Sequence, residues 1–355
     1  MTKSKVAILR TSPETVGEDY RRLMELASCR DALEPGRTTA VHVSLSRTHF
    51  FPSCSTPPWQ LDGILGMLVS GGFKPDDLFA WYDAAIPVSL RQGRVLNRHD
   101  SVLARHGVHP VWFGHEEGTV LQHPKGATRA LGKLFPDGIP LAERLAGVQA
   151  VHLSTMRTRH DTVIAGATAS LLEGLLGPAC RRIGGAINDA LIDILMVNRE
   201  LGGRRMYVMD GVFSGEGADT RDLVPAERNV ILASADPVAL DAAAVTIMGF
   251  EPSSVPWVAL AGEAGLGAAK VGDIELAGDD VSGLRFCMKI DEPVWGRRVR
   301  AFERASSGTI MGLAAGFAAT VYYDWFRYLT VGEGRIREAM RGPWGEVFER
   351  YRKWK

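Results

Sequence analysis

The chain has 355 residues, of which 46% are hydrophobic and 23% charged, and it carries 41 basic against 41 acidic side chains. This composition is typical of a globular protein and excludes a disordered chain or a small disulfide-stapled domain. A net charge of zero gives no electrostatic reason to expect a nucleic-acid partner, because binding phosphates needs an excess of Lys and Arg.

Short β-branched or aromatic runs alternate with amphipathic stretches along the chain. The predicted strands are Val6–Leu9, Thr39–Leu45, Leu78–Tyr82, Val108–Phe113, Val148–Leu153, Met206–Met209, Asn229–Leu232 and Ile274–Leu276. The predicted helices are Tyr20–Ala32, Pro58–Ser70, His99–Arg105, Ala186–Asn198 and Pro237–Met248. Because the strands are continuously apolar, the sequence predicts an α/β fold, a mainly parallel sheet covered by helices on both faces with a helical C-terminal extension. We expect an α/β domain over 1–280, with a division into lobes 1–147 and 148–280 left open, and the extension over 281–355.

The four cysteines are widely spaced and form no CxxC motif, which predicts reduced thiols and a cytoplasmic location. The first residues lead directly into Val6–Leu9 without a long apolar stretch, so we expect no secretory signal.

The functional loops of such a sheet follow the carboxyl ends of its strands. The long loop after Thr39–Leu45 contains Arg47 and His49, next to two phenylalanines. Both residues are candidates for substrate binding.

A basic segment follows the fifth predicted strand and contains Arg157, Arg159 and His160. Two guanidiniums and an imidazole at the start of a helix would bind a carboxylate or phosphate, together with free backbone N–H groups. The alternative is a pair of surface ion pairs with Asp161 as the helix N-cap. Ser170, further along the same helix, is a further candidate for substrate binding.

The segment DGVFSGEGADT follows the sixth predicted strand and holds Asp210 and Glu216. Its glycines, Gly211 among them, would let the backbone approach a ligand, and the two carboxylates would bind a divalent metal or act as acid and base. The alternative is a Gly-rich surface turn in which Asp210 caps the strand end.

The next segment, ASADPVALD, carries two further carboxylates. Asp236 precedes Pro237 and is predicted to be a helix N-cap. Asp241 lies on the next helical turn, where the sequence leaves open whether it faces a cleft or solvent.

Residues Gly308–Tyr323 contain no charge and have glycines at four-residue spacing. A helix of this length spans only about 24 Å, which is short of the roughly 30 Å hydrocarbon layer. We therefore expect it to pack on the main domain or on a second subunit, the alternative being a peripheral membrane contact through residues 308–329. A short amphipathic helix, Pro343–Tyr351, is predicted to close the chain.

The order of these motifs resembles the DUF362 family, whose uncharacterised members are often joined to ferredoxin-like iron–sulfur modules. The matching stretches are KVAILRT, TTAVHVSLS, MRTRHD, GATASLLEGLLG, YVMDGVFSGEG and VILASADPVALDAAAVTIMGF, with PWGEVFERY at the end. The resemblance implies redox chemistry with a ferredoxin-like partner. No cysteine cluster is present, so any iron–sulfur centre would belong to that partner.

The chain departs from the family pattern at two places. Arg157-Thr158-Arg159 stands where the family has Lys-Thr-His, and Ala169-Ser170 replaces a Lys-Asn pair. Any role of that lysine is therefore not carried over. The basic segment also resembles the histidine-and-glycine stretch of nickel-dependent lactate racemases.

The leading functional hypothesis is an enzyme, with a metal-dependent oxidoreductase as one version. Arg157 and Arg159 would hold a small anionic substrate, and Asp210, Glu216 and His160 would supply acid–base or metal-binding groups. One alternative is a cofactor-independent isomerase or racemase-like enzyme. The other is a non-enzymatic binding or assembly protein that docks through its apolar C-terminal helix.

Overall fold

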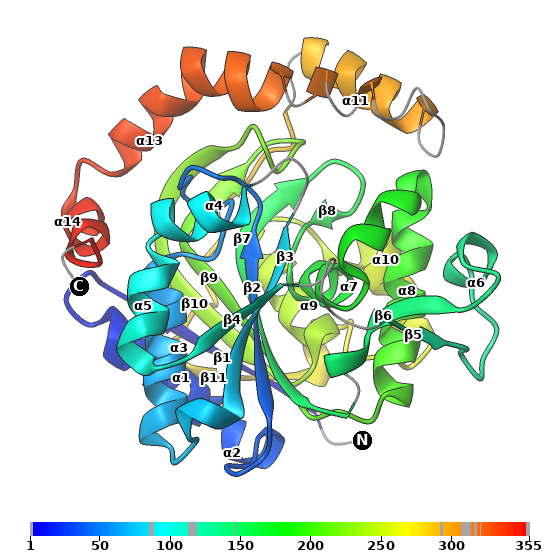
Figure 1. Cartoon of the computed structure of the whole chain (residues 1–355), viewed down its shortest axis with the longest axis horizontal. Coiled ribbons are helices and arrows are strands. Elements are labelled where there is room, and N and C mark those ends of the chain that lie inside the picture. Colours follow the sequence, from blue (N-terminus) through cyan, green and yellow to red (C-terminus); the bar gives the residue numbers. More distant parts are fainter. Residues whose placement is uncertain are drawn as a thin grey trace.

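The computed structural model describes residues 3–84, 89–112, 119–145, 147–291, 294–306, 314–315, 318–319 and 321–352. Its centre is a sheet with the strand order β11-β1-β10-β9-β7-β2-β3-β4 (Figure 1). The strands are β1 (Ser4–Arg10), β2 (Thr39–Leu45), β3 (Leu78–Ala84), β4 (His109–Trp112), β7 (Gln149–Arg159), β9 (Arg205–Glu216), β10 (Val224–Ser234) and β11 (Ile274–Gly278). Within this path β10 runs antiparallel to both of its neighbours, and all other pairs are parallel. The carboxyl ends of β2, β7 and β9 therefore lie at one edge.

Helices cover both faces of this sheet, as the sequence predicts. Alternate residues of β1 enter different cores: Val6 and Ile8 face one helical layer, whereas Ala7 and Leu9 face the other. One layer contains α1 (Val16–Leu26), α3 (Pro58–Ser70), α5 (His99–His106) and α14 (Pro343–Arg350). The other contains α7 (Ala167–Leu176), α8 (Ile187–Glu200), α9 (Pro237–Met248) and α10 (Pro256–Glu263). The predicted fold class is confirmed.

Smaller elements complete the body. They are α2 (Cys29–Ala32), α4 (Leu90–Leu96), α6 (Leu131–Leu134), the hairpin of β5 (Thr119–Gln122) with β6 (Ile139–Ala142), and β8 (Val163–Ile164), which pairs with the end of β7. The single helix predicted over Tyr20–Ala32 is instead two, because the chain turns at Ser28, whose φ of 57° is left-handed.

We call residues 294–341 the C-terminal arm. Its described helices are α11 (Val294–Ser306), a π-helix (Val321–Gly332) and α13 (Glu333–Ala339), and these helices arch over one end of the body (Figure 1). α14 then packs against the body, which confirms the predicted closing helix. Much of the predicted helix over 308–323 lies outside the described residues. In the part of the chain that is described, no helix is both long and apolar enough to cross a membrane.

Candidate functional site

The ends of β7 and β9 lie side by side. After a bulge, Arg157 pairs with Gly215, and the backbone N–H of His160 donates to the carbonyl of Ala218 over 3.1 Å. The basic segment and the glycine-rich segment were expected to be loops, and this expectation is wrong because the ladder continues past the bulge. Arg157 and His160 lie beside the strand end that carries Glu216, whereas Asp210 lies further back along β9.

The guanidinium of Arg157 is buried at this edge, with 5% of the residue exposed. Its Nη1 atom donates to the hydroxyl of Ser46 over 3.2 Å and to the carbonyl of Cys54. Its Nε atom has no hydrogen-bond partner among the described residues. Burial raises the pKa of the Cys54 thiol to about 11 against the opposing effect of the Arg47 and Arg157 guanidiniums. The guanidiniums of Arg47 and Arg157 therefore both lie close to Cys54, in the loop that follows β2.

Arg47 comes from the loop after β2 and is 4% exposed. It donates to the carbonyls of Arg221 and Tyr323, the second over 3.3 Å. Its guanidinium carbon lies 5.2 Å from the ring centre of Tyr328, and the exposed His49 stacks on the same ring at 5.1 Å. Both predicted residues of this loop thus contact the C-terminal arm.

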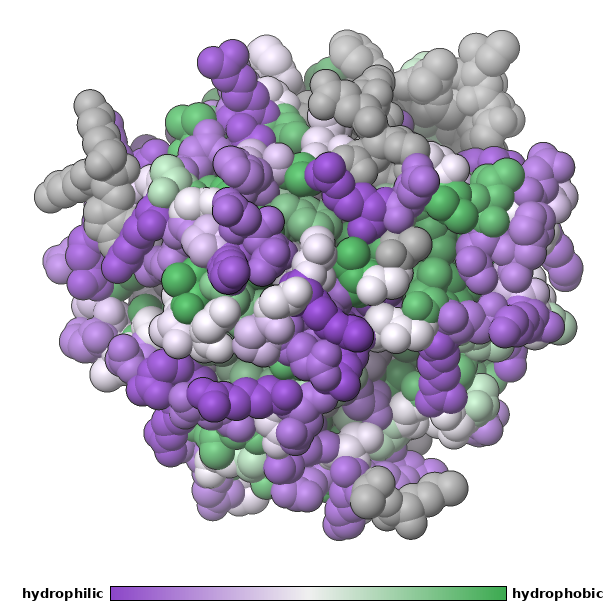
Figure 2. Space-filling view, turned by 60° about the horizontal axis from the view of Figure 1, so that its bottom comes forward, coloured by the Kyte–Doolittle hydropathy of each residue, from purple (hydrophilic) through white to green (hydrophobic). Residues whose placement is uncertain are grey.

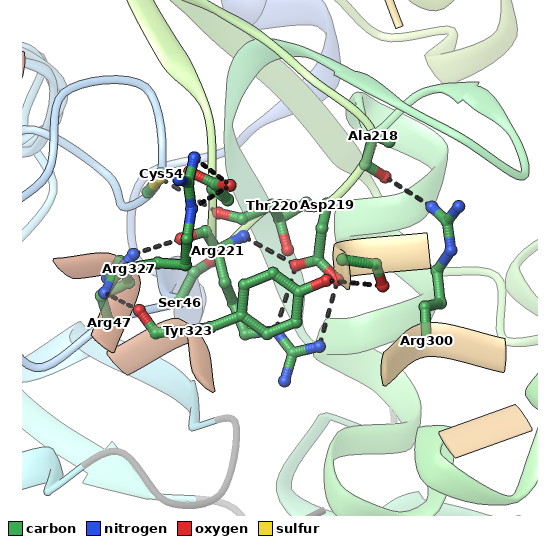
Figure 3. A network of polar contacts seen from close by, with 12 residues as sticks. Ser46, Arg47, Cys54, Ala218, Asp219, Thr220, Arg221, Arg300, Tyr323 and Arg327 are labelled. Carbon is green, nitrogen blue, oxygen red and sulfur yellow. Dashed lines mark hydrogen bonds and ion pairs between the residues drawn. The ribbon is translucent and has the colours of Figure 1, made fainter. Parts of the chain in front are cut away.

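The turn after β9 adds two carboxylates that are fully engaged by arginines. Asp219 pairs with Arg221 at 3.0 Å, beside the arm (Figure 3). Burial tends to raise the pKa of Asp219, but the Arg221 charge and hydrogen bonds lower it to about 2. Asp222 accepts from Arg327 and Arg335 of the arm, at 2.8 Å each. The two ion pairs of Asp222 fasten the arm to the turn after β9.

Arg159 and His160 differ in their surroundings. Arg159 pairs with Asp161 at 2.8 Å and with Glu173 at 3.8 Å. His160 is exposed on the turn between β7 and β8. Of the two predicted anion-binding arginines, Arg159 therefore already has carboxylate partners.

The N-terminus of α7 is occupied by a carboxylate from the chain itself. Asp241 on α9 accepts from the backbone N–H groups of Ala167 and Thr168 over 2.7 and 2.8 Å. The expectation that these N–H groups are free to bind a ligand is wrong, and so is the alternative of Asp161 as the cap. Ser170, one turn further, is buried and lies 3.0 Å from Nδ1 of His42.

Asp210 lies inside the layer of α1 and α3, so it does not cap the strand end. Its Oδ2 accepts from the hydroxyl of Tyr20 over 2.6 Å and from the indole N–H of Trp59 over 2.8 Å. Its Oδ1 accepts from the N–H of Val212 over 3.1 Å. Burial raises the pKa of Asp210 to about 6, although these three hydrogen bonds oppose the rise.

Glu216 ends β9 and is partly exposed. It pairs with Arg228 at 3.1 Å and accepts from the backbone N–H of Lys289. Six residues of strand span roughly 20 Å, so Asp210 and Glu216 cannot share one metal ion. Among the described residues, no group of three or more His, Cys, Asp or Glu side chains could hold a metal ion.

Two glycines of β9 allow close packing. A Cβ on Gly211 would lie 2.8 Å from the carbonyl oxygen of Val230, and one on Gly215 would lie 2.5 Å from Oγ of Ser53. Gly211, a predicted substrate-binding residue, therefore has a packing role. Ser53 has a φ of 71°, a left-handed conformation that is strained for a residue with a side chain.

A small cavity lies away from this edge, among residues near the starts of the strands. It is lined by His42, His152 and Arg205 together with apolar side chains. Neither ring nitrogen of His152 has a hydrogen-bond partner among the described residues, and burial holds its pKa well below the ordinary value. Ser170 is connected to this cavity through its partner His42. The other predicted substrate-binding residues lie elsewhere.

Sequence reasoning missed Ser46, Arg221 and Asp222, as well as the arm residues that contact them. Arg221 and Asp222 directly follow the segment DGVFSGEGADT, and this density of charge was the available signal. Nothing in the local sequence indicates that residues about a hundred positions later return to this edge.

Two comparisons with known proteins found no relative. No protein-family model matches the chain, and no curated protein matches it.

Proposed function

We propose that the chain is an enzyme that binds a small carboxylate or phosphate where β2, β7 and β9 end. Arg157 is the proposed anion ligand, and its surroundings are the observation that carries the proposal. A charge taken out of water costs several kcal/mol unless a counter-charge compensates it. Among the described residues no ion pair to Arg157 is found, and its Nε lacks an acceptor.

The geometry of this guanidinium favours a bidentate ligand. Among the described residues, both hydrogen bonds of the Arg157 side chain use Nη1, and the edge formed by Nε and Nη2 makes none. Carboxylates and phosphates accept two parallel hydrogen bonds from such an edge. The Ser46 hydroxyl and the nearby Arg47 add a donor and a second positive charge.

The conformation of Ser53, in the loop that follows β2, also supports a functional site at these strand ends. Ser53 keeps a left-handed conformation directly over Gly215. Strained residues of this kind cluster at ligand sites, because the surrounding structure must hold them in place.

For the reaction, we assign proton transfer to Glu216 and His160, whose backbone lies at the same strand ends as that of Arg157. Both are partly or fully exposed, so they can exchange protons with solvent or substrate. An isomerase would need only these two groups. An oxidoreductase, which the resemblance to DUF362 implies, would need an external electron carrier such as a ferredoxin, and such a partner is expected in the cytoplasm.

The binding step is tested by isothermal titration with inorganic phosphate and with a panel of short mono- and dicarboxylates. We expect Arg157→Gln to weaken binding of the preferred anion at least about tenfold, and Arg157→Lys to weaken it less. Arg204→Gln, at an exposed arginine just before β9, is the matched control and should bind normally. Equal affinities for the wild type and Arg157→Gln, with both folded by circular dichroism, would refute the proposal.

The reaction step is tested separately with the anion that binds best. Deuterium incorporation into that anion from ²H₂O, followed by NMR, reports proton abstraction without any electron carrier. Glu216→Gln should abolish the exchange while the dissociation constant changes little. Exchange that persists in Glu216→Gln would remove this residue from the mechanism but leave the binding site intact.

A further inference from the structure

Large apolar side chains are exposed along the C-terminal arm. Trp295 is 65% exposed and Trp325 is 67% exposed. The exposed apolar side chains of the arm are Val294, Trp295, Phe302, Val321, Trp325, Phe326 and Leu329. Figure 2, which brings the lower side of the molecule forward, shows hydrophilic residues interspersed with apolar ones on that face. Such a concentration of exposed aromatics marks an interaction surface.

The arm is held to the body by a different set of its residues. Tyr323 is 1% exposed, and Arg327 and Arg335 both bind Asp222. Arg300 donates to the carbonyl of Ala218 over 3.3 Å. The aromatic residues are therefore presented to the outside by an arm that is anchored through its other side chains.

The arm is also the positively charged part of a neutral chain. Residues 294–341 contain eight arginines and four acidic residues, and two of these arginines, Arg327 and Arg335, are paired with Asp222 of the body. α11 alone, VWGRRVRAFERAS, has four arginines and one glutamate. Arg298 stacks on the exposed ring of Trp295, with its guanidinium carbon 4.9 Å from the ring centre.

We infer that the arm docks on the surface of a bilayer that contains anionic phospholipids. Amphipathic helices that combine arginines with exposed tryptophan, phenylalanine or leucine lie in the interface of such membranes. Each arginine near an anionic surface adds attraction, and tryptophan rings favour the headgroup level. A symmetric contact between the arms of two copies would instead bring two positively charged surfaces together.

The test is vesicle flotation of the full chain at 0.1 M and 0.5 M salt. Neutral phosphatidylcholine vesicles are compared with vesicles in which about a quarter of the lipid is phosphatidylglycerol. We expect the bound fraction to be several-fold higher on the anionic vesicles and to fall at the higher salt. Equal binding to both vesicles, or binding to neither, would refute the inference.

Variants locate the contact. Trp325→Ala with Phe326→Ala should lower the bound fraction about fivefold, and Arg297→Gln with Arg298→Gln should remove the preference for anionic vesicles. Leu121→Ser, an exposed position on β5, is the control and should bind as the wild type does. Circular dichroism establishes that each variant is folded.

The alternative partner for the exposed apolar side chains of the arm is a second copy of the chain. Sedimentation velocity without lipid separates the two cases, because a membrane-docking arm leaves the chain monomeric. A dimer that dissociates in the Trp325→Ala, Phe326→Ala variant would show that the aromatic surface is a subunit interface and would overturn the inference.

Discussion

The hydroxyl of Tyr20 donates to a carboxylate oxygen of Asp210 over 2.6 Å, across 190 residues of sequence. Trp59 donates to the same oxygen from α3. One buried carboxylate therefore ties two helices of this layer to the central strand β9. Removing it would leave a buried hydroxyl and a buried indole N–H without their acceptor, which costs stability.

The first prediction concerns the pH dependence of stability. Because burial raises the pKa of Asp210 from 3.8 to about 6, the folded state binds a proton more tightly than the unfolded state does. The contribution of this group to the free energy of unfolding therefore increases as the pH falls from about 7 to 5, by about 1 kcal/mol. Asp210→Asn should lack this contribution in urea unfolding at the two pH values, whereas Asp76→Asn on an exposed turn should keep it. The same pH response in both variants would contradict the assignment.

The second prediction concerns the cap of α7. Asp241→Ala leaves the buried N–H groups of Ala167 and Thr168 without an acceptor. We expect the free energy of unfolding to fall by about 2–4 kcal/mol. Asp241→Asn retains a carbonyl oxygen and should lose less. Urea denaturation at pH 7 measures both variants, and a loss below about 0.5 kcal/mol in the alanine variant would show that the cap contributes little.

The third prediction separates packing from ligand binding at Gly211. A Cβ there meets both the carbonyl oxygen and the side chain of Val230, at 2.8 and 2.9 Å. Gly211→Ala should therefore lower the stability by about 1–3 kcal/mol. Its affinity for the anion that binds at Arg157 should be unchanged. Gly283→Ala, where a Cβ would meet nothing within 4 Å, is the control for thermal denaturation.

The fourth prediction concerns α14 at the end of the chain. Trp344 is 1% exposed, donates to Asn229 over 2.8 Å and has its ring centre 5.2 Å from that of Trp59. Trp344→Ala should cost about 3–5 kcal/mol. Trp295→Ala, at an exposed tryptophan of the arm, should change the stability by less than about 0.5 kcal/mol. Chemical denaturation of the two variants should therefore give clearly different midpoints, and equal midpoints would refute the packing role.

The elements that the sequence predicted best are those with a strong local signal. Thr39–Leu45, Pro58–Ser70 and Pro237–Met248 have the predicted bounds. Apolar runs flanked by polar residues mark the first two, and Asp236 with Pro237 marks the start of the third. Asp236 accepts from the N–H groups of Val238 and Ala239, as expected of an N-cap.

The candidate site was harder to predict because its partners are distant in the sequence. Glycine and charge suggested a loop at DGVFSGEG, yet pairing with β7 and β10 keeps this segment in a strand. The sequence left the orientation of Asp241 open, since only the packing of α9 against α7 decides it. Similarly, the segment around Arg157 indicated an anion site, but only the fold distinguishes Arg157 from Arg159, which has carboxylate partners.

The place of β1 in the sheet has a consequence for how the chain is made. β1 pairs with β10 on one side and β11 on the other, so Ser4–Arg10 has no strand partner until residues beyond 224 have been synthesised. During translation β1 would wait for these later strands before it could join the sheet. Its apolar residues Val6–Leu9, which are buried in the folded chain, therefore lack their strand partners for most of synthesis.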